Sequence, residues 1–296
     1  MMNTPTSAIG IVILDYNQLE ITERCLRSIA AGTLLPDEVV LVENGLLAET
    51  QFSIRTLPFK VTFLSPGRNL GCAGGRNLGL HYLSDNTNAS ILIILDNDTI
   101  IPTDFIQKVA KISIDSSCVI APVIYDLGTN GLWSCGGSLG KHGNIEQLTI
   151  FSDMQKIRYE VDWAPGACLI MKKRTWASVG EFDEWLNFLF EDIEWCRRLT
   201  RLEGKVYVDR NLRIIHDANQ SLGGKWSPAR VYLWARNGTF FIMHTARPGV
   251  LWVVLWLCRE LKDAVRDFVG GYRQWSISRI SGLCRGLIES FRRISR

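Results

Sequence analysis

Short runs of consecutive apolar residues, separated by segments with helical spacing, are the feature that most restricts how this chain can fold. Strands covered on both faces must be apolar at consecutive positions, whereas a strand with one wet face alternates. The apolar runs are Ile9–Leu14, Glu38–Val42, Ile91–Leu95 and Val119–Ala121. The segments with helical spacing are 21–29, Gly71–Leu83 and Thr103–Ile112. This repetition predicts an α/β fold with a mostly parallel central sheet and helices on both faces.

Polar residues directly follow three of these runs, at the carboxyl ends of the expected strands. They are Asp15-Tyr16-Asn17, Glu43-Asn44-Gly45 and Asp96-Asn97-Asp98. In such sheets, ligands bind at the carboxyl ends of the strands. Asn, Asp and Gly are also ordinary turn residues, so a turn alone explains any one of these triplets. The three together favour a nucleotide site.

The second half of the chain is less regular. Glycines in Gly128–Gly143 predict a hairpin and loop, and Ala167–Met171 predicts another buried strand. A helix is expected over Asp192–Thr200, which places apolar residues on one face. Two short strands and a polar loop follow, at Val206–Val208, Ile214–Ile215 and Asp217–Ser227.

Charge is unevenly distributed along the 296 residues, although the total is only +3. Residues 247–296 hold ten Lys and Arg against four Asp and Glu, so this tail carries +6 and the rest of the chain −3. An acidic body argues against a protein that binds nucleic acid over its whole surface. The basic tail predicts a local anionic partner.

The cysteines and the N-terminus indicate a reducing compartment. Eight cysteines are scattered without a C-x-x-C pair, which argues against zinc and disulfides. Met1–Ala8 lacks the basic and apolar regions of a signal peptide, so a cytoplasmic location is expected. Val250–Cys258 is the longest uncharged apolar run, and it is shorter than the ~20 residues that a membrane-spanning helix needs.

The tail after this run mixes apolar residues with regularly spaced arginines. Those arginines are Arg259, Arg266, Arg273, Arg279 and Arg285. This composition is typical of a helix that lies in a membrane interface, with its cations among acidic headgroups. The alternative is an ordinary amphipathic helix docked on the domain. The first interpretation predicts a protein held peripherally on the inner face of the cytoplasmic membrane.

Asp96 and Asp98, separated by one residue at a strand end, form the clearest candidate metal site. Mg²⁺ and Mn²⁺ take oxygen ligands and are usually held by one or two carboxylates together with substrate phosphates. Such an ion stabilises the charge that develops on a departing diphosphate. D-x-D is a common pattern, and its position after a buried strand is what strengthens the prediction.

Glu191 and Asp192 open the expected helix, directly after the aromatic segment Trp185–Phe190. Acidic residues at a helix N-terminus are stabilised by the helix dipole, and this capping role explains one carboxylate better than two. The functional alternative is a general base that takes a proton from an attacking hydroxyl. The aromatic segment would then form the wall of the acceptor site.

Two further features lie near expected ligand positions. His216 ends an apolar strand, where it is either a core residue or a metal ligand that completes the shell begun by Asp98. Small residues in Gly71–Gly75 allow the backbone to approach a ligand, and Arg76 beside them can reach a phosphate or a base. The dinucleotide pattern G-x-G-x-x-G does not follow the first strand.

The order of these motifs resembles the inverting glycosyltransferases of family two, which have a GT-A fold, and within them the rhamnosyltransferase-like group. The matching segments are VILDYN at 12–17, VENG at 42–45, NLGCAGGRNLG at 69–79, LDND at 95–98, WAPGACLIMKK at 163–173, GEFDE at 180–184, FLFEDIEWCRRL at 188–199, His216 and RNGTFF at 236–241. An ordered series of this length is far more specific than a single D-x-D.

The resemblance implies a nucleotide-sugar pocket. Asp15 and Tyr16 would lie against the nucleoside, and Arg76 and Asn77 would shape the pocket. The other residues expected in it are Asn17, Glu43, Asn44, Asn69, Gly71, Asp96 and Asn97. Glu43 stands where the family usually has Asp, which leaves the base open between uridine and thymidine.

The resemblance also implies catalytic roles. Asp192 would be the base, with Glu191 as the neighbour that orients the acceptor. Asp98 and His216 would hold Mg²⁺ or Mn²⁺, and Asp96 would contact the metal or the ribose. The expected reaction is a single displacement that inverts the anomeric centre, with dTDP-rhamnose a reasonable donor and a saccharide or polyprenyl-linked glycan the acceptor.

The predicted organisation is a glycosyltransferase domain over residues 1–246 and a basic helical tail over 247–296. The domain would divide into a nucleotide-binding half, about 8–125, and an acceptor-binding half, about 126–246.

A sugar nucleotidyltransferase is a weaker alternative, because it needs a glycine-rich basic loop where this chain has Asp15-Tyr16-Asn17. A glycosidase needs no metal site. A scaffold that only binds sugar nucleotides has no need of all four of Asp96, Asp98, Asp192 and His216. The sequence predicts nothing about the oligomeric state.

Overall fold

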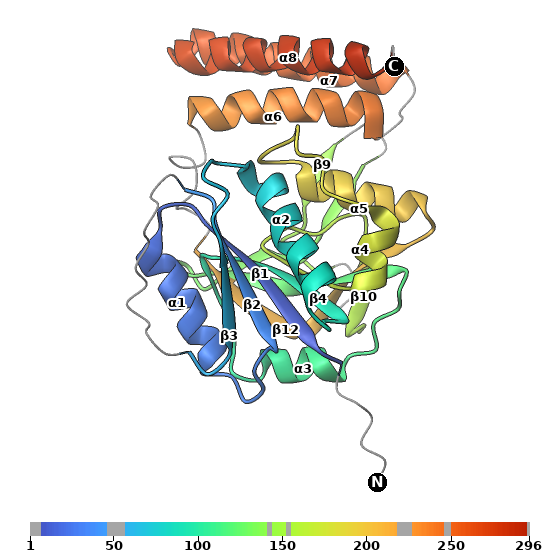
Figure 1. Ribbon diagram of the computed structural model, residues 1–296. Helices are drawn as coiled ribbons and strands as arrows, with labels where there is room; N and C mark the ends of the chain where they lie inside the picture. The colour runs from blue at the N-terminus through green and yellow to red at the C-terminus, as the bar shows by residue number, and fades with distance from the viewer. Residues whose placement is uncertain are drawn as a thin grey trace.

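The computed structural model describes residues 7–45, 57–140, 144–151, 155–217, 227–245 and 250–294. A sheet domain covered by helices lies below a layer of three long helices formed by the last part of the chain (Figure 1). The α/β fold predicted from the apolar runs is confirmed.

Four parallel strands form the first half of the sheet. They are β1 (Ile9–Asp15), β2 (Glu38–Glu43), β3 (Lys60–Leu64) and β4 (Ile91–Asp96), in the spatial order β4-β1-β2-β3. Both faces of β1 are buried: Val12 belongs to the core on one side, and Ile11 and Ile13 belong to the core on the other. This two-sided burial explains the continuous apolar run.

Helices cover both faces of this sheet. On one face lie α1 (Leu19–Ala30) and α3 (Phe105–Lys111), and on the other lie α2 (Gly71–Asn86), α4 (Lys173–Val179) and α5 (Glu191–Arg201). Helix α2 approaches β1 closely, since a Cβ at Gly79 would come within 2.4 Å of Val12 and one at Gly75 within 2.6 Å of Leu14. Glycine at these positions brings the start of α2 next to the strand ends.

The second half of the sheet contains antiparallel strands, and the full order is β10-β12-β6-β11-β4-β1-β2-β3. The central strands are β6 (Cys118–Asp126), β11 (Cys168–Lys172) and β12 (Lys205–His216), with β10 (Arg158–Val161) at the edge. Two short strands, β5 (Thr99–Ile100) and β7 (Leu132–Ser134), pair with β12 and β6, while β8 (Gly137–Leu139) and β9 (Ile145–Gln147) form a separate hairpin.

The two strands expected at Val206–Val208 and Ile214–Ile215 are one strand, β12, so that prediction is wrong in its division. The register of β12 against β6 shifts between Asp209 and Arg213, which marks an irregularity where extra residues are accommodated. The polar residues of this irregularity interrupt the apolar pattern, and for this reason the sequence predicted two strands where the structure has one. The loop predicted at Asp217–Ser227 falls almost entirely outside the described residues.

The helical layer consists of α6 (Pro228–Phe240), a π-helical turn over Phe241–Thr245, α7 (Val250–Val269) and α8 (Arg273–Ile294). Helix α8 packs along α6 and against α7. A Cβ at Gly282 would lie 2.4 Å from the carbonyl oxygen of Tyr232, and one at Gly286 would lie 2.5 Å from that of Arg236. These two glycines therefore let the α8 backbone approach that of α6 closely.

The tail is thus a helical hairpin with one face docked on the domain. Among the five tail arginines expected to face an anionic surface, the prediction for Arg279 is wrong. Its guanidinium is buried and lies 2.7 Å from Glu260 and 3.1 Å from Asp267, because it joins α7 to α8. The predicted domain boundary at residue 246 lies outside the described residues.

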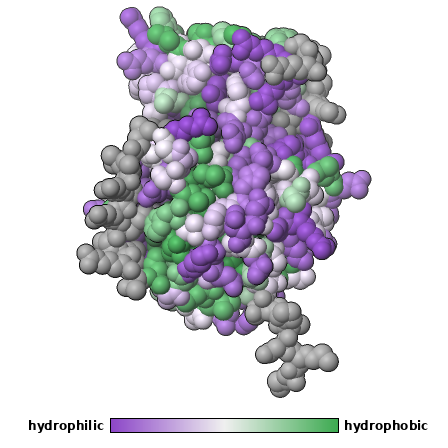
Figure 2. Space-filling view, viewed as in Figure 1, coloured by the Kyte–Doolittle hydropathy of each residue, from purple (hydrophilic) through white to green (hydrophobic). Residues whose placement is uncertain are grey.

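None of the described helices is both long and apolar enough to cross a bilayer. On the face drawn in Figure 2, hydrophobic and hydrophilic residues are intermixed over the helical layer at the top.

Candidate active site

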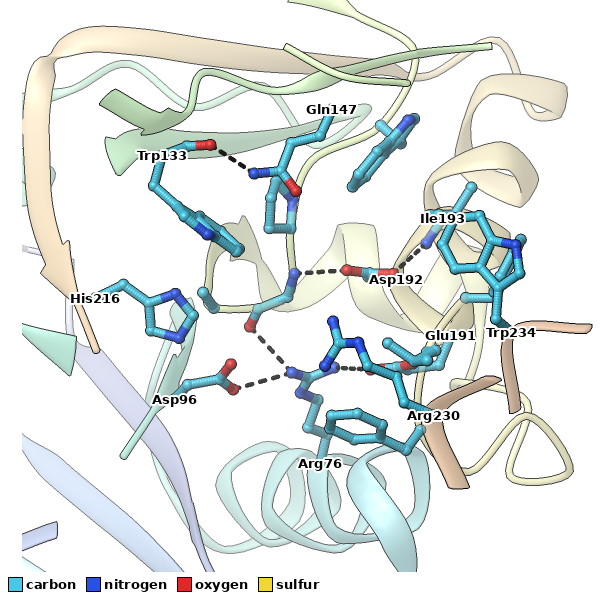
Figure 3. A pocket seen from close by; sticks show the side chains of 17 residues that line it. Arg76, Asp96, Trp133, Gln147, Glu191, Asp192, Ile193, His216, Arg230 and Trp234 are labelled. Atoms are coloured by element: carbon cyan, nitrogen blue, oxygen red, sulfur yellow. Dashed lines mark hydrogen bonds and ion pairs between the residues drawn. The ribbon is translucent and has the colours of Figure 1, made fainter. Parts of the chain in front are cut away.

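A cavity of about 200 Å³ opens at the carboxyl end of β4, between the sheet domain and α6. Its wall combines Arg76 of α2, Asp96 of β4, His216 of β12 and the start of α5 with Arg230 and Trp234 of α6 (Figure 3). This is the edge at which the strand-end residues predicted a ligand. The cavity therefore lies where the topology of the sheet favours binding.

Arg76 is the charged centre of this wall. Its Nη1 donates to Glu191 Oε1 at 2.7 Å, and its Nη2 donates to Asp96 Oδ1 at 3.0 Å and to the carbonyl of Gly166 at 3.2 Å. The side chain is only 3% exposed. A Cβ at position 166 would lie 2.6 Å from both Nη atoms, so glycine there makes room for the guanidinium.

Glu191 and Asp192 begin α5 but face different surroundings. Glu191 is buried against Arg76, whereas the half-buried Asp192 lines the cavity, where its Oδ2 accepts a hydrogen bond from the Gly166 N–H at 2.9 Å. Burial and the adjacent charge of Asp192 raise the pKa of Glu191 to about 7, against the opposing effect of Arg76. Burial also raises the pKa of Asp192, although the Gly166 N–H lowers it. A carboxylate with a raised pKa is a stronger base.

Asp96, Asp98 and His216 come together as a candidate metal cluster, with one ligand atom from each lying within 4.8 Å of the others. Asp98 and His216 are 5% and 7% exposed, and His216 Nε2 lies 2.9 Å from Asp98 Oδ1. The Nδ1 atom of His216 is buried without a hydrogen bond in the described part of the chain, while the buried Asp98 Oδ1 has the imidazole as its neighbour.

These residues fit a divalent ion. Buried polar atoms without partners are costly, and two carboxylates with one imidazole form a ligand set suited to Mn²⁺ or Mg²⁺. The ring of Trp133 packs edge-on against that of His216 at 4.8 Å, which holds the imidazole toward Asp98.

The aromatic segment that leads into α5 has an unusual backbone. Asn187, Leu189 and Phe190 have φ values of 60°, 70° and 73°, a left-handed region in which residues other than glycine are strained. Leu189 and Phe190 line the cavity. The strained residues therefore form part of the cavity wall.

Helix α6 stabilises this segment through Asn237. The side-chain amide of Asn237 donates to the carbonyls of Leu186, Phe188 and Leu189 at 2.7, 2.9 and 2.7 Å. Arg236 adds hydrogen bonds to the carbonyls of residues 185 and 186. The Arg-Asn pair of the RNGTFF segment is therefore a clamp on the cavity wall.

The remaining predicted nucleotide-binding residues lie outside the lining of this cavity. Asp15 is buried and accepts a hydrogen bond from Thr22 at 2.6 Å, and Asn97 donates to the same hydroxyl at 2.9 Å. These side chains thus fix the start of α1 next to β4. Tyr16 is 52% exposed beside them, while Asn17 has a φ of 55°.

Several predicted amides hold the backbone around the start of α2. Asn44 bonds Leu70 and Gly71, and Asn69 bonds the Gly71 N–H. Gly71 has a φ of 71°, and a Cβ there would collide with Asn187. Asn77 both donates to and accepts from the backbone of Phe182. Glu43 is half-buried at the end of β2.

Residues 10–170 match the family model described as glycosyl transferase family 2, which is more than half of the chain. The chain belongs to glycosyl transferase family 2. The enzyme class predicted from the ordered motifs is thereby confirmed.

Curated relatives of this family 2 enzyme include the dTDP-rhamnosyl transferase RfbF of Shigella flexneri, 26% identical over 72% of this chain and 73% of the relative. The low-salt glycan biosynthesis hexosyltransferase Agl10 of Haloferax volcanii is 23% identical over 80% of this chain and 76% of the relative. The resemblance to the rhamnosyltransferase-like group is thus supported by a named member.

Solved structures show the same fold. The crystal structure of GalNAc-T7 with UDP, GalNAc and Mn²⁺ has a TM-score of 0.63 and 16% identity, and the match covers 92% of this chain but 59% of that one. Residues 1–349 of Staphylococcus aureus TarS have a TM-score of 0.55 and 14% identity, with 94% of this chain and 80% of that one covered. The GT-A fold expected for a family 2 enzyme is confirmed.

Sequence reasoning missed part of the cavity wall of this family 2 enzyme. Trp133, Gln147, Arg230 and Trp234 line the cavity and were not among the predicted site residues. Gln147 donates to the Trp133 carbonyl at 2.5 Å, which joins β9 to β7. Only the four-residue spacing of Arg230 and Trp234, one helical turn, offered a signal that they share a face.

Proposed function

We propose that this enzyme is a metal-dependent inverting glycosyltransferase. It moves a sugar from a nucleoside-diphosphate sugar to a hydroxyl of a glycan or lipid-linked saccharide. The supporting observation is that one cavity contains both the Asp192 carboxylate and two members of the Asp96, Asp98 and His216 cluster. A base and a metal-ligand set on one cavity are what a single displacement requires.

Asp192 is the proposed base. Its carboxylate is half-buried in the cavity, and its neighbour Glu191 is occupied by the 2.7 Å ion pair with Arg76. The acceptor hydroxyl gives its proton to an oxygen of Asp192 as it attacks the anomeric carbon from the face opposite the nucleoside diphosphate. Since the sugar passes directly from donor to acceptor, the anomeric configuration is inverted.

Asp98 and His216, with Asp96, are the proposed ligands of Mg²⁺ or Mn²⁺. The bound ion would supply Lewis-acid stabilisation of the negative charge on the departing diphosphate. Arg76 balances the charge of Asp96 and Glu191, which keeps three carboxylates stable in a small volume. Glu191 acts through this network and through its position next to Asp192, where it would orient the acceptor.

The nucleotide part of the donor is assigned to the neighbouring strand ends. Asp15, Tyr16, Asn17, Glu43, Asn44, Asn69, Gly71, Asn77 and Asn97 are the residues proposed to form or support that region. Asp15, Asn44, Asn77 and Asn97 act by fixing α1 and α2, since their side chains are hydrogen-bonded within the protein. The relation to RfbF favours dTDP-rhamnose as the first donor to test.

The hairpin α7–α8 is proposed to hold the enzyme on the inner face of the cytoplasmic membrane. Its outer face carries large apolar side chains that are at least 45% exposed, namely Leu251, Val254, Leu261, Val265, Phe268, Val269, Tyr272, Ile277, Ile280, Ile288 and Phe291. Lys262, Arg266, Arg273 and Arg285 are exposed among them. Apolar area bordered by cations is what anionic lipid binds.

The donor screen is the experiment that tests the proposed activity. Purified enzyme is incubated with a panel of sugar nucleotides and Mg²⁺ or Mn²⁺, and release of nucleoside diphosphate is measured with and without EDTA. We expect release from dTDP-rhamnose or another donor that EDTA abolishes. The Asp98→Asn variant should require more metal for the same rate. Binding of a sugar nucleotide without release, with every acceptor offered, would instead favour a scaffold.

A further inference from the structure

A second cavity of about 360 Å³ lies between α6 and the hairpin α7–α8, and no step of the proposed reaction uses it. It shares Arg230 and Trp234 with the first cavity, so one turn of α6 forms a wall common to both. Ile145 of β9 closes one side. A molecule that occupied both cavities would cross this wall.

The second cavity is rich in arginine, and two of its arginines lack a carboxylate partner. Arg279 is paired with Glu260, and Arg266 with Asp263 at 3.1 Å. Arg230 and Arg259, by contrast, form no ion pair with any carboxylate among the described residues. The positive charge of these two guanidinium groups is therefore available to a ligand.

Arg259 is nevertheless held in a fixed position. Its Nη1 donates to Asn144 Oδ1 at 2.9 Å, and its guanidinium lies 4.5 Å from the centre of the Trp256 ring. Arg230 is half-buried, and burial lowers the pKa of its side chain. Figure 3 shows the Arg230 side chain extending into the first cavity. A cation desolvated without a counterion is destabilising, and a bound anion offsets that cost.

We propose that this second cavity binds the phosphate or diphosphate group of a lipid-linked acceptor, with Arg259 as its main ligand and Arg230 at the boundary with the first cavity. The proposal rests on the proposed glycosyltransfer and names the class of its acceptor. Guanidinium groups form paired hydrogen bonds to the charged oxygens of a phosphate. An uncharged saccharide has no such oxygens. The donor's diphosphate is assigned to the Asp96, Asp98 and His216 cluster, so this anion belongs to the other substrate.

The position of the cavity fits such an acceptor. The saccharide would pass Trp234 into the first cavity and present its hydroxyl to Asp192. The lipid would leave toward the exposed apolar face of α7 and α8. Phosphate sites between a polar cavity and an apolar surface suit a molecule that is sugar at one end and hydrocarbon at the other.

Binding of geranylgeranyl diphosphate tests this proposal. Affinity is measured by calorimetry on the full-length protein in excess EDTA, so that no metal holds the diphosphate at the acidic cluster. Geranylgeraniol, which has the same chain without phosphates, is the comparison. We expect the diphosphate to bind at least tenfold more tightly than the alcohol, and Arg259→Gln to remove this preference. Arg259→Lys should keep most of it, because lysine also binds phosphate as a point charge.

Two further variants control this experiment. Arg213→Gln removes the same charge from an exposed position of β12, away from both cavities, and should bind geranylgeranyl diphosphate as the unmodified protein does. Ile145→Glu places a carboxylate in the cavity from β9 and should reproduce the loss if Arg259→Gln fails to fold. Equal affinity for alcohol and diphosphate, or a preference that survives both Arg259→Gln and Ile145→Glu, overturns the proposal.

Inorganic diphosphate and phosphatidylglycerol vesicles identify the source of the anion. Binding of inorganic diphosphate alone, with the same dependence on Arg259, supports the anion site and assigns it to a free phosphate compound. Binding of phosphatidylglycerol vesicles that depends on Arg259 assigns the bound anion to lipid headgroups. The donor screen separates this proposal from the proposed function. If nucleoside diphosphate is released but geranylgeranyl diphosphate binds no better than geranylgeraniol, only the anion site in the second cavity is rejected. If geranylgeranyl diphosphate is preferred but no donor releases nucleoside diphosphate, only the glycosyltransfer is rejected.

Discussion

The two cavities that meet at α6 have opposite charge arrangements. In the first, Arg76 lies between two carboxylates, and its Nη atoms donate to Glu191, Asp96 and the Gly166 carbonyl. In the second, arginines outnumber carboxylates, and Arg230 and Arg259 have no described carboxylate partner. Arg76 is therefore part of the protein's own charge balance, whereas the other two arginines are available to bind a substrate.

The cavities also arise from different elements. The first is built at strand ends, with its acidic residues fixed by the sheet and by the start of α5. The second is built from helix faces that come together only when α6, α7 and α8 pack. The proposed chemistry would therefore take place at the sheet edge, and the proposed anchoring of the acceptor at the helical layer.

The largest effect is expected for Asp192→Asn, which removes the proposed base from the acidic cavity. Transfer should fall about 10²- to 10⁴-fold, the usual contribution of a general base. Donor binding should persist, because Asp192 forms no ion pair with the other cavity residues among the described side chains. Nucleoside-diphosphate release and equilibrium donor binding measure the two properties. Glu203→Gln, an exposed carboxylate just after α5, is the control. Unchanged transfer in Asp192→Asn contradicts the base assignment.

Arg76→Gln tests whether the first cavity depends on charge balance within the protein. The substitution leaves the buried Glu191 without its partner, and breaking such a pair costs about 3–5 kcal/mol of unfolding free energy. Urea unfolding measures the loss. Arg213→Gln, at an exposed position of β12, should change stability by less than about 0.5 kcal/mol. Equal stability of the two variants would mean that Arg76 is not needed to hold the carboxylates.

The pH dependence of stability tests the environment of Glu191. Its pKa in the folded protein, about 7, lies above the ordinary value of 4.5, so the folded chain holds the proton more tightly than the unfolded chain. This stabilisation is fully present below pH 4.5 and is lost as the pH rises to about 7. The unmodified protein should therefore lose stability relative to Glu191→Gln across that window. A difference that is constant with pH contradicts a raised pKa.

Asn237→Ala tests the connection between the helical layer and the acidic cavity. The carbonyls of Phe188 and Leu189 lose the Asn237 donor, whereas that of Leu186 keeps its hydrogen bond from Arg236. Each buried group left unsatisfied costs about 1–3 kcal/mol before the segment relaxes. We expect lower thermal stability and a lower kcat, because the cavity wall is no longer held in place. Asn86→Ala removes an exposed amide at the end of α2 and serves as the control. A full kcat in Asn237→Ala would show that the wall does not depend on this clamp.

The smallest effect is expected on the outer face of the hairpin. Deleting the tail would uncover α6, since α8 packs along it, so substitutions are the better test. Val265→Glu with Ile277→Glu should lower binding to anionic vesicles about tenfold, because two exposed apolar side chains become charged. Co-sedimentation with vesicles measures this. The matched control is Thr33→Glu with Thr103→Glu, which adds the same charge near the start of α3 in the sheet domain. An equal loss of vesicle binding in this control would mean that the added negative charge alone causes the loss.

The sequence was informative where one physical signal dominates. Runs such as Ile91–Leu95 are buried on both faces, and this made the first half of the sheet predictable. Strand ends then located Asp96 and Asp98, and the end of a third strand located His216. The acidic cluster was therefore visible because sheet topology alone brings these positions together.

Other parts depend on tertiary contacts that carry no local signal. β3 is an edge strand with exposed positions, so it lacks a continuous apolar run. Helix α6 is covered by the sheet domain on one side and by α8 on the other, which blurs its helical periodicity. Arg230 and Trp234 enter the cavity only through the placement of that helix, and Arg279 looks like a surface arginine until α7 and α8 pair.

The stereochemistry of transfer is the most direct test of a single displacement at the acidic cavity with Asp192 as base. Once the donor screen has identified a sugar nucleotide, the anomeric configuration of the first-formed product is determined by proton NMR and compared with that of the donor. An inverted configuration is the predicted result. Retention would require either two displacements through a covalent intermediate or attack from the leaving-group face through an ion pair, and either would contradict the role given to Asp192.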